Sequence, residues 1–145
     1  MGDDRPGWRI HAGLCWFAAG LVACGSFLLG PAKYAAQLSS APQLLEFERL
    51  QNLMLHAAQW LLLPVLAAWA FLGRATGWRL IGAAAALGLF VVQMAVVQPR
   101  LDRASAMRIL GEDPAPSAWP TLHAAIEVLK IGCLVGAGFS RTPKG

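Results

Sequence analysis

Charged residues are rare in this chain of 145 residues, where aspartate, glutamate, lysine and arginine together make up 14%. A soluble domain has about 25%, so the chain has too little charge for a surface that faces water. Its mean hydropathy of +0.51 agrees with this. The apolar residues are gathered into long runs, a pattern typical of membrane proteins rather than of soluble cores.

Cysteines, basic clusters and catalytic motifs are also scarce. The three cysteines form no CxxC pair, which excludes a disulfide framework or a zinc knuckle. The basic residues behind the net charge of +4 stand singly rather than in a block, so we expect no nucleic-acid partner. No Ser/His/Asp arrangement, phosphate-binding loop or pair of pocketed carboxylates is apparent. Acyl, phosphoryl and glycosyl chemistry therefore lack support, and we do not expect an enzyme.

Four long apolar runs are what the chain does have, at residues 10–32, 50–73, 80–99 and 118–140. Each is about 20 residues or longer, enough to cross a hydrocarbon core of about 30 Å as a helix. The sequence therefore predicts an all-α fold, an integral membrane four-helix bundle in which residues 1–145 form a single transmembrane domain.

The ends of the runs carry the residues expected of helix ends. Pro31 and Pro99 are expected to end the first and third helices, and the short link 73–79 predicts an antiparallel hairpin. The aromatic residues expected at the membrane interface are Trp8, Trp16, Tyr34, Trp78 and Trp119. The basic residues divide almost evenly between the two sides. We favour cytoplasmic termini and a bacterial inner membrane, with the lipid bilayer as surroundings.

Polar side chains recur at helical spacing inside these runs. His123, Glu127 and Lys130 lie on one face of the fourth run, at i, i+4 and i+7. Asn52, His56 and Gln59 have the same spacing in the second run, which crosses in the same direction. Gln93 lies near the end of the third run, which crosses in the opposite direction, so all seven residues fall in the same half of the membrane.

A charged side chain at the centre of a transmembrane helix raises the free energy of insertion by about 2.5–3.5 kcal/mol. We therefore expect the polar faces of these helices to turn away from lipid and toward the inside of the bundle. Glu127 and Lys130 are predicted to form an i, i+3 ion pair. The seven residues are thus predicted to form one intramembrane polar site. Gly132 and Gly136 form a GxxxG motif that is expected to permit close helix packing.

Several functions are compatible with such a site. The leading hypothesis is a non-enzymatic accessory or interaction subunit with an intramembrane docking or cation-handling site, assembled with other membrane subunits or as a homo-oligomer. One alternative is a subunit that binds haem b or copper through His56 and His123. Another is a small oligomeric proton or ion transporter. A purely structural ion pair is the remaining interpretation.

Three stretches together indicate a family: GSFLLGPAKYAAQL at 25–38, VVQPRLDRA at 96–104 and WPTLHAAIEVL at 119–129. The chain resembles small four-helix bacterial membrane proteins of unknown function, related to the eukaryotic transmembrane proteins linked to cisplatin resistance. The matching residues are Pro31, Pro99, Arg100, Arg103, Leu122 and His123. The chain departs from the family pattern in carrying both Glu127 and Lys130. The resemblance implies a fold and a membrane location, and no settled activity or cofactor.

Overall fold

The computed structural model describes residues 6–28, 41–73, 75, 77–112 and 115–139, and all regular structure within these ranges is helical. The predicted all-α fold is confirmed. The four helices that are long and apolar enough to cross a membrane cover Gly7–Leu28, Glu46–Leu72, Trp78–Ile109 and Trp119–Phe139. Pro31, Tyr34 and residues 29–32 and 140 of the predicted runs lie outside the described residues.

The first two long helices differ from the predicted runs mainly at one end. The first comprises α1 (Pro6–Ala23) and a π-helical turn, η1 (Cys24–Leu28). The second, α3 (Ala41–Leu72), begins well before the predicted start at residue 50. Its added segment has a proline in the first turn and then mostly strong helix formers, which explains the earlier start. These extra residues lengthen α3 beyond its apolar run.

The third helix does not end at Pro99, so that prediction is wrong. The segments α4 (Trp78–Val92), η2 (Gln93–Val97) and α5 (Gln98–Ile109) follow one another without a break. In the π-helical turn η2 the backbone N–H of Gln98 reaches back to the carbonyl of Gln93, so the hydrogen-bond register shifts just before the proline. The Arg100 guanidinium then donates to the carbonyl of Val96 at 3.1 Å. The helix thus continues through Pro99, although this residue has no N–H to donate.

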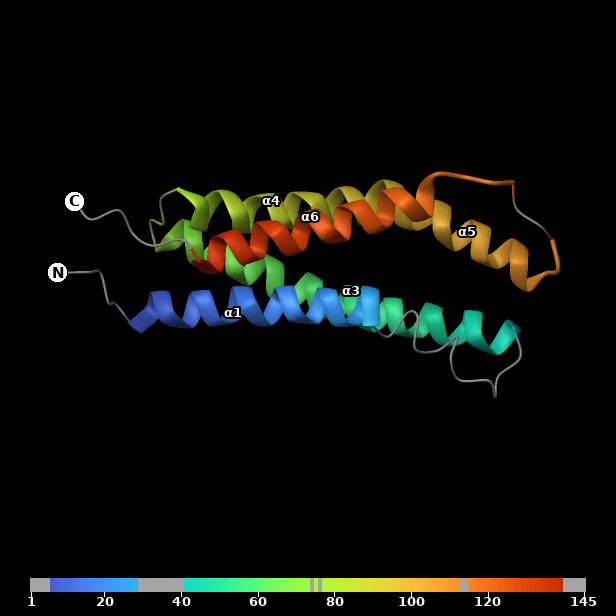
Figure 1. Cartoon of the computed structure of the whole chain (residues 1–145), viewed down its shortest axis with the longest axis horizontal. Helices are drawn as coiled ribbons and strands as arrows, with labels where there is room; N and C mark the ends of the chain where they lie inside the picture. Colours follow the sequence, from blue (N-terminus) through green and yellow to red (C-terminus); the bar gives the residue numbers. More distant parts are fainter. Residues whose placement is uncertain (1–5, 29–40, 74, 76, 113–114, 140–145) are drawn as a thin grey trace.

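The four long helices form a bundle in which α6 (Trp119–Phe139) packs along α1 and α4, and α3 packs against the same two helices (Figure 1). The predicted hairpin is present: α3 ends at Leu72, and α4 begins at Trp78 after a short link. A glycine at φ 60°, Gly77, closes this link just before Trp78. In Figure 1, α1 begins and α6 ends at this same end of the bundle.

Small residues bring α4 and α6 together, although not those of the GxxxG motif. A Cβ added at Gly82 would lie 2.5 Å from the carbonyl oxygen of Cys133, so the two backbones touch there. A Cβ added at Gly132 or Gly136 would meet nothing within 4 Å. The expected close approach at this motif is therefore not found within the described chain, because another face of α6 meets α4.

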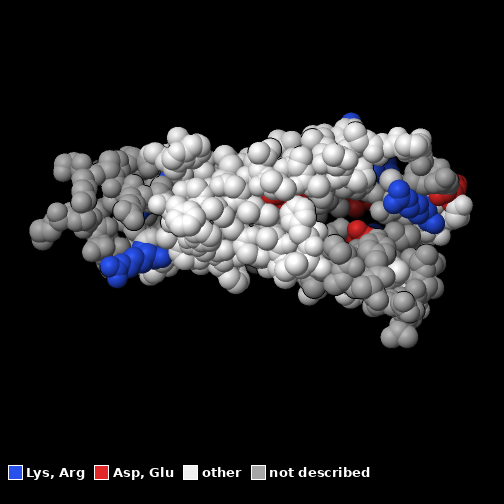
Figure 2. Space-filling model, viewed as in Figure 1, with Lys and Arg blue, Asp and Glu red and all other residues white. Residues whose placement is uncertain are grey.

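Arginine–tryptophan pairs lie toward both ends of the bundle. The Arg79 guanidinium lies 4.8 Å from the ring centroid of Trp8, and that of Arg100 lies 4.2 Å from the ring centroid of Trp119. Between these ends the surface in Figure 2 is mostly white, with the blue atoms toward both ends and the red atoms from the middle toward the right end. A few red atoms are visible in a hollow between the helices.

Candidate functional site

The seven polar residues predicted to form a site divide into a buried group and two partly exposed residues. Gln93, Glu127 and Lys130 are 0% exposed, and Gln59 and His56 are almost fully buried. The side chain of His123 is 21% exposed. Asn52 is partly exposed and has no hydrogen bond to the other six within the described structure. Asn52 thus lies outside the group, and His56 joins it through ring contacts rather than through a hydrogen bond to the other predicted residues in the described structure.

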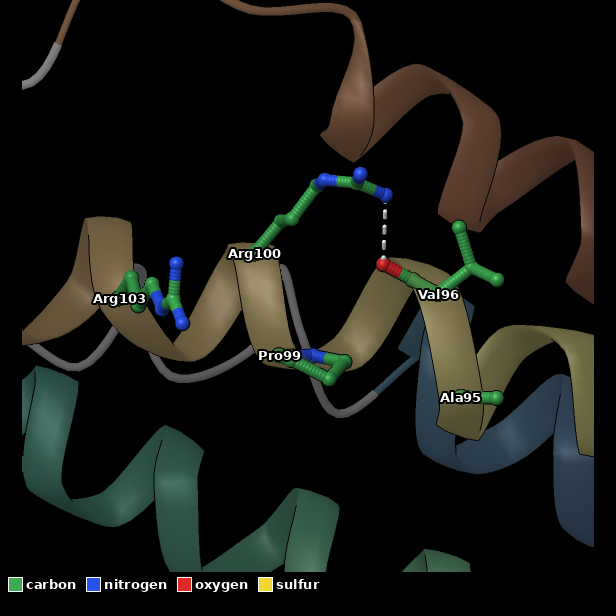
Figure 3. A pocket seen from close by; sticks show the side chains of 5 residues that line it. All are labelled: Ala95, Val96, Pro99, Arg100 and Arg103. Carbon is green, nitrogen blue, oxygen red and sulfur yellow. Dashed lines mark hydrogen bonds between the residues drawn. The ribbon is translucent and has the colours of Figure 1, made fainter.

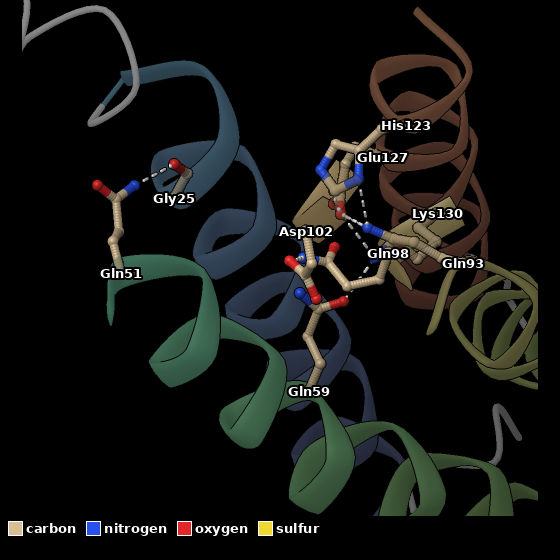
Figure 4. A network of polar contacts seen from close by, with 9 residues as sticks. All are labelled: Gly25, Gln51, Gln59, Gln93, Gln98, Asp102, His123, Glu127 and Lys130. Atoms are coloured by element: carbon tan, nitrogen blue, oxygen red, sulfur yellow. Dashed lines mark hydrogen bonds and ion pairs between the residues drawn. The ribbon is translucent and has the colours of Figure 1, made fainter. Parts of the chain in front are cut away.

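Glu127 is the centre of the hydrogen-bond network. Its Oε1 accepts from Lys130 Nζ at 3.0 Å and from Gln93 Nε2 at 2.6 Å (Figure 4). His123 Nε2 lies 3.8 Å from the same oxygen. The predicted i, i+3 ion pair is therefore present, and it extends to a third residue, one turn earlier on α6.

Two further contacts join α6 to its neighbours. Lys130 Nζ donates to Gln59 Oε1 of α3 at 2.6 Å. Gln93 Nε2, at the start of η2, lies 3.1 Å from His123 Nδ1. Three helices thus supply the network, which compensates part of the cost of burying two charges.

An aromatic group that the sequence analysis missed completes the surroundings of the lysine. Lys130 Nζ lies 5.1 Å from the ring centroid of Phe90, which is 0% exposed. The same ring lies 5.0 Å from Trp60 and 6.1 Å from His56. Phe90 is three residues before Gln93, and this i, i+3 spacing is the signal that would have placed it on the same face. The ammonium is held by two oxygens and a ring face.

The network leaves three buried polar atoms without a hydrogen-bond partner in the described structure: Glu127 Oε2, Gln93 Oε1 and Gln59 Nε2. A buried group left in this state costs about 1–3 kcal/mol. Such groups are normally satisfied by water, an ion or a ligand. Two of the three atoms are acceptors, and one of these is a carboxylate oxygen, so the unused capacity favours a donor or a cation.

His56 and His123, the two residues of the metal-binding alternative, lie close together. Their ring centroids are 6.4 Å apart, with 69° between the ring planes. Both ring nitrogens of His123 already face Gln93 and Glu127. Within the described ranges, no group of three or more His, Cys, Asp or Glu side chains is placed to hold a metal ion. Haem or copper ligation by His123 would replace one of these contacts, and the metal-binding alternative stays a prediction.

Comparison of the chain with models of protein families, with curated proteins and with solved structures finds no match. The family resemblance carried by residues 25–38, 96–104 and 119–129 therefore stays a prediction.

Proposed function

We propose that this chain is an integral membrane protein that crosses the bilayer four times. Four long apolar helices support this, and so does the outer surface. Large apolar side chains are exposed along the length of the helices, including Phe17 at 63%, Leu61 at 75%, Ile81 at 56% and Leu129 at 56%. Water would oppose so much exposed apolar surface, whereas lipid solvates it.

The bacterial inner membrane and cytoplasmic termini belong to the same proposal. The shared end at which α1 begins and α6 ends supports placing both termini on one side. The resemblance to small bacterial membrane proteins supports the location.

We further propose that the protein is non-enzymatic and that its buried network handles a cation, in the simplest case a proton. The observation that carries this is the unpaired carboxylate oxygen Glu127 Oε2, buried in the same network as the unpaired Gln93 Oε1. Both are acceptors, so they suit a proton, a hydrated proton or a small cation. Ionisable groups inside a membrane typically mark such pathways. The partly exposed His123, bonded to this network, gives access from outside.

Direct docking of a partner onto the charges is less well supported than cation handling. Glu127 and Lys130 are 0% exposed within the single chain, so a partner helix would not reach them without opening the bundle. A second copy of the chain could instead bind the face of α6 that carries Gly132 and Gly136. Gly132 and Gly136 have no atom within 4 Å of an added Cβ, and a GxxxG face suits helix association. This supports an accessory or homo-oligomeric role. Several copies together would also provide enough helices to line a transport path.

The test of cation handling is proton flux in liposomes. The purified full chain is reconstituted with an entrapped pH-sensitive dye, and a potassium diffusion potential drives protons inward. We expect flux well above that of empty liposomes and a loss of at least tenfold in Glu127→Gln, because the amide cannot take up a proton. Glu112→Gln, at an exposed carboxyl outside the network, is the matched control and should be unchanged.

Two further measurements complete this experiment. A second set of liposomes, loaded with a sodium indicator, shows whether the cation is sodium instead. Thermal unfolding of Glu127→Gln checks that the variant is folded. Equal flux in empty liposomes and in liposomes with wild-type protein, for protons and for sodium, would overturn the proposal. So would a folded Glu127→Gln variant with full flux.

A further inference from the structure

A cavity of about 270 Å³ lies beside the junction of η2 and α5, and no residue of the buried network lines it. It is lined by Ala95, Val96, Pro99, Arg100 and Arg103 (Figure 3). Two of the five lining residues are arginines from successive turns of one helix. The cavity is thus basic at one side and apolar at the other.

The two guanidinium groups are available to an anion. Within the described structure neither has an ion-pair partner, although Arg100 NH1 donates to the carbonyl of Val96 at 3.1 Å. The nearby carboxylate of Asp102 accepts from Gln98 Nε2 at 2.9 Å and does not line the cavity. The ring of Trp119, 4.2 Å from the Arg100 guanidinium, fixes the position of that group. Guanidinium groups suit phosphate oxygens, which they bind with several N–H groups.

The position of the cavity along the helix indicates whether its phosphate ligand is a lipid headgroup or a free ion. The helix Trp78–Ile109 has 32 residues, which is about 48 Å at 1.5 Å per residue. About 20 of these cross the hydrocarbon core, so a crossing that begins at Trp78 ends near Pro99. Arg100 and Arg103 then lie at the level of the lipid headgroups. Trp119, at the start of α6, is an interfacial aromatic at the same level.

We propose that this cavity binds the phosphate group of an anionic phospholipid, with Arg100 and Arg103 as the phosphate ligands and the apolar wall against the lipid tails. Basic pockets between transmembrane helices recognise anionic headgroups, and with cytoplasmic termini this pocket faces the leaflet on the opposite side of the membrane. Free inorganic phosphate shares the same chemistry, and the experiment separates the two sources. The site is independent of the proposed cation handling, apart from the shared assumption of a membrane.

The test measures lipid binding to the full chain by native mass spectrometry and thermal unfolding in nanodiscs. Nanodiscs of phosphatidylcholine are compared with nanodiscs that also contain phosphatidylglycerol. We expect wild-type protein to retain phosphatidylglycerol in preference to phosphatidylcholine. The preference should fall about fivefold in Arg103→Gln and about 30-fold in the double variant Arg100→Gln/Arg103→Gln, from the attraction of each arginine to anionic lipid.

Arg108→Gln is the matched control, because it removes the same charge from α5 at an exposed residue outside the cavity. It should keep the preference. Arg103→Gln disturbs neither the Val96 bond nor the Trp119 ring, so it remains informative if the double variant unfolds. An equal loss in Arg108→Gln, or an unchanged preference in the double variant, would overturn the site. Stabilisation by inorganic phosphate in phosphatidylcholine nanodiscs, with no added effect of phosphatidylglycerol, would overturn the lipid assignment.

Discussion

Removing one charge of the Glu127–Lys130 pair should destabilise the protein far more than removing both. In Lys130→Leu, Glu127 keeps only Gln93 as a close donor, its Oε2 stays unpaired, and Gln59 Oε1 loses its donor. Breaking a buried ion pair in this way costs about 3–5 kcal/mol, because an uncompensated charge stays buried. We expect Glu127→Leu to cost a similar amount. Within the described structure, the Lys130 ammonium then loses its only negatively charged partner and keeps only Gln59 and the face of Phe90 as contacts.

The double variant Glu127→Leu/Lys130→Leu removes both charges. Replacing a buried pair by apolar side chains is often neutral or stabilising by about 1–4 kcal/mol. Here Gln59 Oε1 loses its donor at a cost of about 1–3 kcal/mol, while Gln93 keeps its contact with His123. The two terms nearly cancel, so the double variant should lie within about 2 kcal/mol of wild type. It should insert at least as well as wild type and lose the proposed cation handling.

The measurement is equilibrium unfolding in mixed micelles, followed by the fluorescence of the six tryptophans. We expect a coupling free energy between Glu127 and Lys130 of at least about 3 kcal/mol. Hydrogen bonds between membrane helices average only about 0.6 kcal/mol in such cycles. Two single variants that each cost less than about 1 kcal/mol and add in the double variant would refute the buried, mutually dependent pair. Full flux in the double variant would show that the charges serve packing alone.

Three further outcomes follow from single contacts. Gly82→Ala should destabilise the bundle by about 1–3 kcal/mol in the same unfolding assay, because its Cβ would press on the Cys133 carbonyl. The control is Gly88→Ala, where an added Cβ meets nothing within 4 Å; this variant should be neutral or stabilising by up to about 1 kcal/mol. Phe90→Leu should cost about 2 kcal/mol by removing the ring face from the buried ammonium, and a similar cost after that ammonium is removed would contradict this. The purified protein should show no Soret band, since His123 is already held by protein groups; a band that His123→Ala abolishes would restore the haem hypothesis.

The helical fold and most members of the polar group were predictable from local pattern. Apolar runs of about 20 residues predict long helices whatever their neighbours. The spacing of His123, Glu127 and Lys130 places them on one face of a helix, because 3.6 residues make a turn. The cost of exposing Glu127 and Lys130 to lipid predicts that this face turns inward. None of these inferences needs the position of another helix.

Pro99 shows where local reasoning failed. Proline ends most helices because it lacks an N–H and clashes with the preceding turn. Here a π-helical turn at Gln93–Val97 precedes the proline, and the helix continues to Ile109. Register shifts of this kind depend on packing and on donors from side chains, so the letters around a proline do not reveal them.

The sequence by itself determined that the chain has four long apolar helices and that a few ionisable residues repeat at helical spacing within them. Only the tertiary structure decided which of these residues meet: Gln59 reaches Lys130, Gln93 reaches Glu127, and Asn52 stays outside. It also decided that Gly82, rather than the glycines of the GxxxG motif, carries the close helix contact. The physical reason is that periodicity sets the face of each helix, whereas rotation and depth between helices come from the packing of all side chains together.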